Sequence, residues 1–127
     1  MASILIIEDS EETAFILTHQ LESLGCRITT TPTATQGLVE LETNLFDLVL
    51  MDLRLPDMDG IEATSLARRF TKVPIVGLTA DLSPTQKAKG LAAGMNDMQI
   101  KTLQREDLRA ILVRFVPDDP SKTCYNA

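Results

Sequence analysis

The sequence has no tryptophan, a single tyrosine and two cysteines, and only 4% of its residues are aromatic. It contains no apolar run of the roughly eighteen residues that a membrane-spanning helix needs. Its first segment, MASILIIEDS, lacks the basic region of a signal peptide. Cys26 and Cys124 lie far apart without metal-ligand spacing, which predicts free thiols. Together these absences predict a cytoplasmic protein that contacts no membrane.

The charge is one-sided, because 18 acidic residues outnumber 12 basic ones and leave a net charge of −6. Direct binding of nucleic acid is therefore not expected of this domain. The single histidine, His19, is expected to be exposed, and no phosphotransfer pattern surrounds it. A length of 127 residues suits one domain with one core. We predict this domain at residues 1–117, followed by a polar tail or linker at 118–127.

Short apolar runs alternate with amphipathic stretches five times along the chain. This pattern predicts strands at 4–7, 27–31, 47–51, 75–78 and 97–100, with helices over 14–24, 34–41, 60–70, 84–93 and 108–115. The positions expected to face the core are Ile61, Leu66 and Phe70 in the third helix and Ala88, Leu91 and Ala92 in the fourth. The alternation predicts an α/β fold with a doubly wound parallel sheet and helices on both faces.

Charged and hydroxyl residues stand where four of the predicted strands end. They are Glu8 and Asp9 after the first strand, Asp52 after the third, Thr79 after the fourth and Lys101 after the fifth. Taken singly, each is more simply a turn or helix-cap residue. Because the carboxyl ends of parallel strands meet at one edge of the sheet, their joint occurrence there predicts a functional site.

The residue types in this set favour phosphoryl transfer. Three neighbouring carboxylates raise each other's pKa unless a cation lies among them. Carboxylate oxygens suit Mg²⁺, which also binds phosphate oxygens. With its charge neutralised, Asp52 can approach an anionic phosphoryl group as a nucleophile and form an aspartyl phosphate. Lys101 and the Thr79 hydroxyl would stabilise the other phosphoryl oxygens.

Four motifs, ILIIEDS, LVLMDLRLPDMDG, PIVGLTA and AGMNDMQIKT, resemble those of receiver domains from two-component response regulators and hybrid sensor kinases. This is the family of the bacterial chemotaxis regulator, and the resemblance covers about residues 3–116. It implies a flavodoxin-like fold whose five-stranded parallel sheet has the order 2-1-3-4-5, which periodicity alone does not give. It implies a signalling domain that catalyses only its own phosphorylation and dephosphorylation.

Carried over to this sequence, the resemblance makes Asp52 the phosphoacceptor, with Lys101 and Thr79 as its catalytic and switching partners. The implied Mg²⁺ ligands are Glu8, Asp9, Asp52 and the backbone carbonyl of Arg54. The implied donor is a phosphohistidine on a sensor histidine kinase or a histidine phosphotransfer protein. A homodimer that forms on phosphorylation is also compatible with the family.

Two positions depart from the family pattern. Thr102 replaces the usual proline after Lys101, so we expect a trans peptide bond, a shifted loop and a weaker reach of Lys101 toward Asp52. Met98 stands where the family often has an aromatic residue that turns inward on phosphorylation.

A separate hypothesis concerns two charges near the site. Arg54 and Asp81 could pair across the mouth of the site and shield the aspartyl phosphate, although two independent surface charges fit equally well.

Three functions remain open at this point. The first is a phosphorylation-dependent switch, and the second is a constitutive adaptor in which phosphorylation is weak or absent, which Thr102 and Met98 favour. The third is a small phosphohydrolase of the haloacid-dehalogenase type, but those enzymes have a second aspartate where Arg54 stands. The stretch LTADLSPTQKAKGLAAGMND is similar to receivers of hybrid kinases, so the chain is either a free-standing regulator or part of such a kinase.

Overall fold

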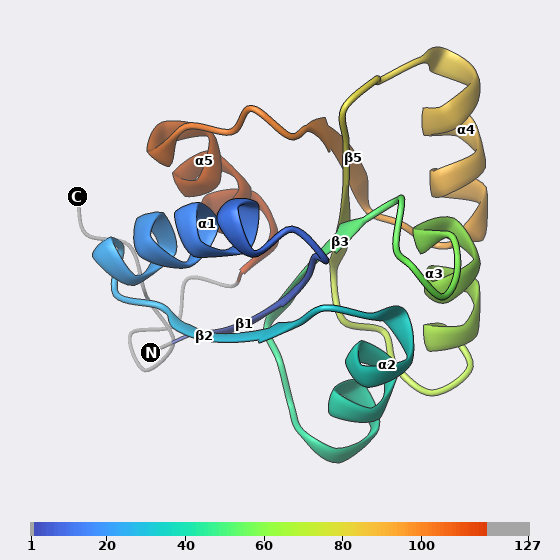
Figure 1. Cartoon of the computed structure of the whole chain (residues 1–127), viewed down its shortest axis with the longest axis horizontal. Helices are drawn as coiled ribbons and strands as arrows, with labels where there is room; N and C mark the ends of the chain where they lie inside the picture. Colours follow the sequence, from blue (N-terminus) through green and yellow to red (C-terminus); the bar gives the residue numbers. More distant parts are fainter. Residues whose placement is uncertain (1, 117–127) are drawn as a thin grey trace.

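The computed structural model describes residues 2–116, which form five strands alternating with five helices (Figure 1). The strands are β1 (Ser3–Ile7), β2 (Arg27–Thr31), β3 (Leu48–Asp52), β4 (Ile75–Thr79) and β5 (Asp97–Ile100). The helices are α1 (Glu11–Ser23), α2 (Ala34–Thr43), α3 (Gly60–Ala67), α4 (Pro84–Ala93) and α5 (Arg105–Phe115). The predicted tail at 118–127 lies outside the described residues.

All four strand pairings are parallel, and the sheet has the order β2-β1-β3-β4-β5. This confirms the predicted doubly wound, flavodoxin-like sheet. The order reverses direction next to β1, so β1 and β3 lie side by side and their helices leave on opposite faces. The switch point of the sheet therefore lies between the carboxyl ends of β1 and β3, which is where such folds bind ligands.

The strands are buried on both faces and separate two layers of helices. Helices α1 and α5 cover one face, and α2, α3 and α4 cover the other (Figure 1). Along β1, Ile4 and Ile6 pack beneath α1 and α5, whereas Leu5 and Ile7 pack on the opposite side. This alternation explains why the run has no polar residue, since both of its faces are covered.

Helix α3 is shorter than predicted and ends at Ala67 instead of Phe70. The amides of Arg69 and Phe70 donate to Leu66 and Ala67, three residues back, so the chain tightens into a turn. The buried face consists of Gly60, Ala63, Thr64 and Ala67. The prediction of Phe70 as a core position is wrong, because this side chain is 42% exposed. Ile61 and Leu66 are half-buried, and Ile61 packs against the core.

The predicted inner face of α4 is also wrong, because Ala88, Leu91 and Ala92 are all exposed. The buried residue of this helix is Gly90. A Cβ atom at Gly90 would collide with the side chain of Met98, so the missing side chain lets α4 approach β5 closely. Close packing on a small residue therefore turns the larger apolar side chains outward.

Cys26 is disulfide-bonded, so the prediction of a free thiol is wrong for this residue. Cys124 lies outside the described residues. Within residues 2–116, no helix has the length and apolar character required to cross a membrane.

Candidate phosphoacceptor site

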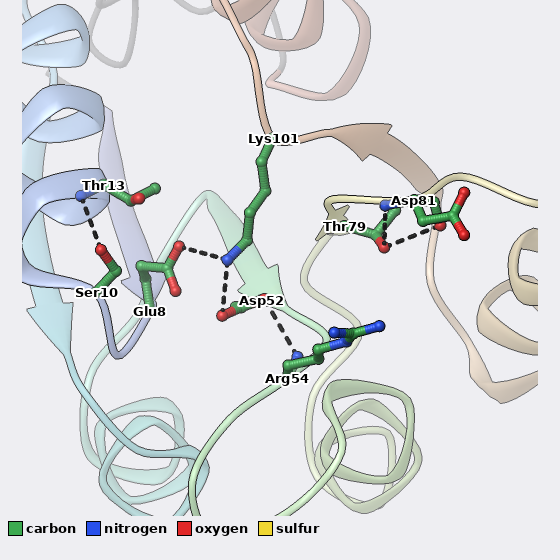
Figure 2. Close-up of polar contacts among 8 residues, drawn as sticks. All are labelled: Glu8, Ser10, Thr13, Asp52, Arg54, Thr79, Asp81 and Lys101. Atoms are coloured by element: carbon green, nitrogen blue, oxygen red, sulfur yellow. Dashed lines mark hydrogen bonds and ion pairs between the residues drawn. The ribbon is translucent and has the colours of Figure 1, made fainter.

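The predicted site residues arrive at the carboxyl edge of the sheet from four strands. Asp52 is the last residue of β3 and Thr79 the last of β4, while Glu8 follows β1 and Lys101 follows β5. Figure 2 shows Glu8 and Asp52 on either side of the Lys101 ammonium group, with Thr79 on the far side of Asp52. Parallel pairing brings together residues that are far apart in the sequence.

Lys101 bridges the two buried carboxylates. Its Nζ lies 3.0 Å from Glu8 Oε1 and 3.0 Å from Asp52 Oδ2. The side chains of Glu8 and Asp52 are 0% and 2% exposed, whereas that of Lys101 is 27% exposed. The peptide bond before Thr102 is trans as predicted. The expected weaker reach of Lys101 toward Asp52 is not found, because the long side chain spans the distance.

The protonation of these three groups is strongly coupled. Burial raises the pKa of Glu8 to about 7, and a hydrogen bond that its protonated form gives to Asp52 adds to this effect. Burial also acts to raise the pKa of Asp52, but hydrogen bonds from Glu8 and Lys101 outweigh it and lower the pKa below the usual value. The same two carboxylates raise the pKa of Lys101 against the effect of its burial. Asp52 is therefore ionised at neutral pH.

The carboxylates form a group that fits a divalent cation. Oxygen atoms of Glu8, Asp9 and Asp52 all lie within 4.8 Å of one another, with Glu8 and Asp52 buried and Asp9 exposed. The side chains of Glu8 and Asp52 are buried next to each other with one ammonium group between them, so ionisation of both leaves an excess of negative charge. A hard cation such as Mg²⁺ would compensate that charge. The residues present thus fit the predicted metal.

The second oxygen of Asp52 is held by the chain that follows it. Arg54 N donates to Asp52 Oδ1 at 3.2 Å (Figure 2), and the Arg54 backbone pairs with that of Asp59. Gly60 N donates to Leu53 O at 2.8 Å, and a Cβ at Gly60 would collide with the Asp52 carbonyl oxygen. We call residues 53–59 the phosphoacceptor loop. Its compact path directs the backbone of Arg54 toward the carboxylate.

Among residues 2–116, the structure records no ion pair between Arg54 and Asp81, which does not support their proposed pairing. The Asp81 backbone instead engages Thr79. Thr79 Oγ1 donates to Asp81 O at 3.1 Å and accepts from Asp81 N at 3.2 Å (Figure 2). The Thr79 hydroxyl is thus at the predicted edge but is bonded to the loop after β4. Met98 is 1% exposed and fully inside the core.

Sequence reasoning missed the role of Asp57. Its carboxylate accepts hydrogen bonds from Ala34 N at 2.9 Å, Thr35 N at 2.8 Å and Thr35 Oγ1 at 2.6 Å. These bonds lower the pKa of Asp57 to about 2, and the bond from the Thr35 hydroxyl makes the largest contribution. The sequence carries no local signal for this contact, because the capped helix lies more than twenty residues earlier in the chain.

Comparison with known proteins agrees with this geometry. Residues 4–113 match the family model of the response regulator receiver domain. The chain is 37% identical over 120 residues to the hybrid signal transduction histidine kinase G of Dictyostelium discoideum, covering 90% of this chain and 4% of that protein. It is 33% identical over 116 residues to the transcription factor SKN7 of Saccharomyces cerevisiae, covering 91% of this chain and 19% of that protein.

A solved structure shows the same fold. The receiver domain of the sensor histidine kinase PA1611 from Pseudomonas aeruginosa PAO1 is 36% identical, with a TM-score of 0.83 over 90% of this chain and 96% of that one. That structure has a magnesium ion coordinated in its active-site cleft. The chain spans less than a quarter of the two curated relatives, so the activities of those whole proteins are not assigned to it. On the match over residues 4–113, the chain belongs to the response regulator receiver domain family.

Proposed function

We propose that this chain is a phosphoacceptor domain of a two-component phosphorelay, which takes a phosphoryl group from a phosphohistidine onto Asp52. The observation that carries the proposal is the contact of Lys101 with the ionised Asp52 carboxylate beside the carboxylates of Glu8 and Asp9. A buried nucleophile, a cation and an acidic metal group at one sheet edge are the parts that phosphoryl transfer requires.

In this proposal, some side chains bind the metal and others stabilise charge or orient the Asp52 carboxylate. Glu8, Asp9, Asp52 and the backbone carbonyl of Arg54 would hold Mg²⁺, which supplies neutralisation of the charge on the transferred phosphoryl oxygens. Lys101 Nζ, now shared between Glu8 and Asp52, would turn to a phosphoryl oxygen. Arg54 N, which donates to Asp52 Oδ1, keeps the carboxylate oriented.

In the transfer step, a carboxylate oxygen of Asp52 forms a bond to phosphorus. The bond between phosphorus and the imidazole nitrogen of the donor breaks, and that nitrogen keeps the electron pair and takes up a proton. Lys101 stabilises the charge that develops on the phosphoryl oxygens. Water then attacks phosphorus, the bond from phosphorus to the Asp52 oxygen breaks, and inorganic phosphate leaves with Asp52 in its free form. The domain thus catalyses only its own phosphorylation and dephosphorylation.

The switch would begin at Thr79. Its hydroxyl is bonded to the Asp81 backbone, and these bonds would break as the hydroxyl turns toward the new phosphoryl group. The loop after β4 would then move and alter the surface offered to partners. The implied partners are a sensor histidine kinase or a phosphotransfer protein, with a phosphorylation-dependent homodimer as a further outcome.

A cytoplasmic location is part of the proposal. The disulfide at Cys26 does not support it, because disulfides are rare in reducing compartments.

One observation favours the alternative of a constitutive adaptor. Met98 is already buried, so this position has no exposed side chain that could turn inward on phosphorylation.

Phosphoramidate tests the proposal, because it carries the phosphorus–nitrogen bond of phosphohistidine. The expected result is Mg²⁺-dependent addition of one phosphoryl group to the wild type and none to Asp52→Asn. Glu62→Gln, which changes an exposed acid on α3, serves as the control and should be modified like the wild type. A wild type that takes up no phosphoryl group would favour the adaptor.

A further inference from the structure

The N-terminus of α2 is capped from two different parts of the chain. Its own cap residue, Thr33, accepts a hydrogen bond from Gln36 N at 3.2 Å. The first two amides of the helix, Ala34 N and Thr35 N, instead donate to Asp57 in the phosphoacceptor loop. Among the described residues, the N-terminal caps of the other four helices come from residues adjacent to their first turn.

The Asp57 carboxylate accepts three hydrogen bonds from the first turn of α2. Both carboxylate oxygens are used, and Oδ2 accepts from both the amide and the hydroxyl of Thr35. The acceptor is ionised and faces the positive end of the helix, so the bonds are charge-assisted. Asp57 and Thr35 are both exposed, which limits the effect to the size of an ordinary helix cap.

The other end of the phosphoacceptor loop lies on the phosphoacceptor itself. Arg54 N donates to Asp52 Oδ1, and Gly60 N closes the loop onto Leu53 O. Only a short, closed segment therefore separates the Asp52 carboxylate from the carboxylate of Asp57. A displacement of Arg54 toward a new group on Asp52 would therefore shift the residues between Arg54 and Asp57, because these bonds close the loop.

Helix α2 has a second anchor that leads to the same site. A Cβ at Gly37 would collide with the side chain of Ile7, which directly precedes Glu8. Glu8 N also donates to Thr31 O at 3.0 Å, just before the turn that starts α2. The end of β1, where Glu8 stands, is thus held close to the start of α2.

We propose that Asp57 is a positioning residue that couples the phosphoacceptor loop to the N-terminus of α2. A change at the Asp52 carboxylate then alters how well the first turn of α2 is ordered. In the reverse direction, the order of that turn alters how firmly the loop holds Arg54. This inference rests on the proposed function for its trigger, and coupling between two sites is reciprocal.

Amide hydrogen exchange with Mg²⁺ as the probe tests the forward direction. In the wild type, Mg²⁺ should slow exchange at Arg54 and also at Ala34 and Thr35, the latter two by roughly fivefold, the size of one helix cap. Asp57→Ala should abolish the response of Ala34 and Thr35 while Arg54 still responds. Asp59→Ala is the matched control, because Asp59 caps α3 from the same loop through Ile61 N at 2.7 Å. The α2 amides should still respond in Asp59→Ala.

A metal-free experiment tests the reverse direction. Thr35→Val removes the hydroxyl that donates to Asp57 and nearly preserves the shape of the side chain. It should speed exchange at Arg54 by roughly threefold, the effect of one hydrogen bond. Thr43→Val makes the same change at the other end of α2, where the hydroxyl bonds within the helix, and should leave Arg54 unchanged.

The two arms separate this inference from the proposed function. An Asp57→Ala protein whose α2 amides still respond to Mg²⁺ would overturn the coupling, and so would an unchanged Arg54 in Thr35→Val. If no amide of the wild type responds to Mg²⁺, the metal part of the proposed function fails. The Thr35→Val arm then decides the coupling by itself.

Discussion

Lys101 Nζ lies 3.0 Å from Asp52 Oδ2 and at the same distance from Glu8 Oε1. One ammonium group thus offsets part of the negative charge of two buried carboxylates that would otherwise repel each other more strongly. The group has two opposing effects on the site, because it repels a divalent cation and attracts a phosphoryl group.

Lys101→Met should separate these two effects. Without the ammonium charge, Mg²⁺ binds several-fold more tightly, while phosphorylation slows by about 100-fold because one stabilising cation is lost. Titration with Mg²⁺ and the rate of phosphorylation by a small donor measure the two quantities. Lys89→Met, at an exposed lysine on α4, should change neither. Equal phosphorylation rates in Lys101→Met and the wild type would contradict the role given to Lys101.

The metal-free protein should lose stability as the pH rises toward 8. The pKa of Glu8 is about 7 in the folded state and near 4.5 in the unfolded chain, so the folded state holds the extra proton between these values. The contribution of this proton to the free energy of unfolding is fully present below pH 4.5 and is lost as the pH rises through 7. Denaturant unfolding in EDTA at pH 5 to 8 measures the free energy of unfolding.

Glu8→Gln is the control for this pH dependence, because its amide does not titrate. Its free energy of unfolding should be nearly constant over the same pH interval. A wild type with a flat profile would refute the assignment of the raised pKa to Glu8. Mg²⁺ affinity in the wild type should change in the opposite sense and rise with pH, since the proton and the cation compete for one carboxylate.

Two glycine-to-alanine variants should differ in stability although both lie in close contacts. At Gly60, a Cβ would meet the backbone of Asp52 and Leu53, which cannot move cheaply. At Gly77, it would meet Met95 Sδ at 2.7 Å, the movable end of a flexible side chain. Gly60→Ala should therefore destabilise by about 3 kcal/mol and Gly77→Ala by about 1 kcal/mol. Chemical denaturation measures both, and an equal loss would argue against a rigid phosphoacceptor loop.

Met98→Ala should reduce stability without slowing phosphorylation. The Met98 side chain is buried against Gly90 and its deletion leaves a cavity, which should lower the free energy of unfolding by about 2–4 kcal/mol. It does not contact the carboxylates, so the phosphorylation rate should stay near that of the wild type. Leu91→Ala, on the exposed face of α4, should change stability by less than about 0.5 kcal/mol. A large rate loss in Met98→Ala would show that this residue takes part in the chemistry.

The sheet and the positions of the acidic residues could be predicted from the sequence because their signals are local. An apolar run as short as ILII is typical of a strand covered on both faces, and an acid that follows such a strand lies at its end. The strand order came from the family resemblance, since periodicity does not encode which strands are neighbours.

The predictions that failed depend on contacts between distant segments. Leu91 fits a buried position by helical spacing, yet the close approach of Gly90 to Met98 turns it outward. The bond from Asp57 to Thr35 joins residues that no short window of sequence compares. The contacts of Lys101 with Glu8 and Asp52 likewise depend on how closely the ends of β5, β1 and β3 approach one another, which the sequence alone does not give.

The central claim is that Asp52 is the phosphoacceptor, and intact mass spectrometry tests it most directly. The protein is incubated with Mg²⁺ and acetyl phosphate, beside Asp52→Asn and a sample in EDTA. The account predicts one added phosphoryl group on the wild type and none in either of the other samples. Addition of the same mass to Asp52→Asn, or no addition to a wild type that binds Mg²⁺, would contradict it.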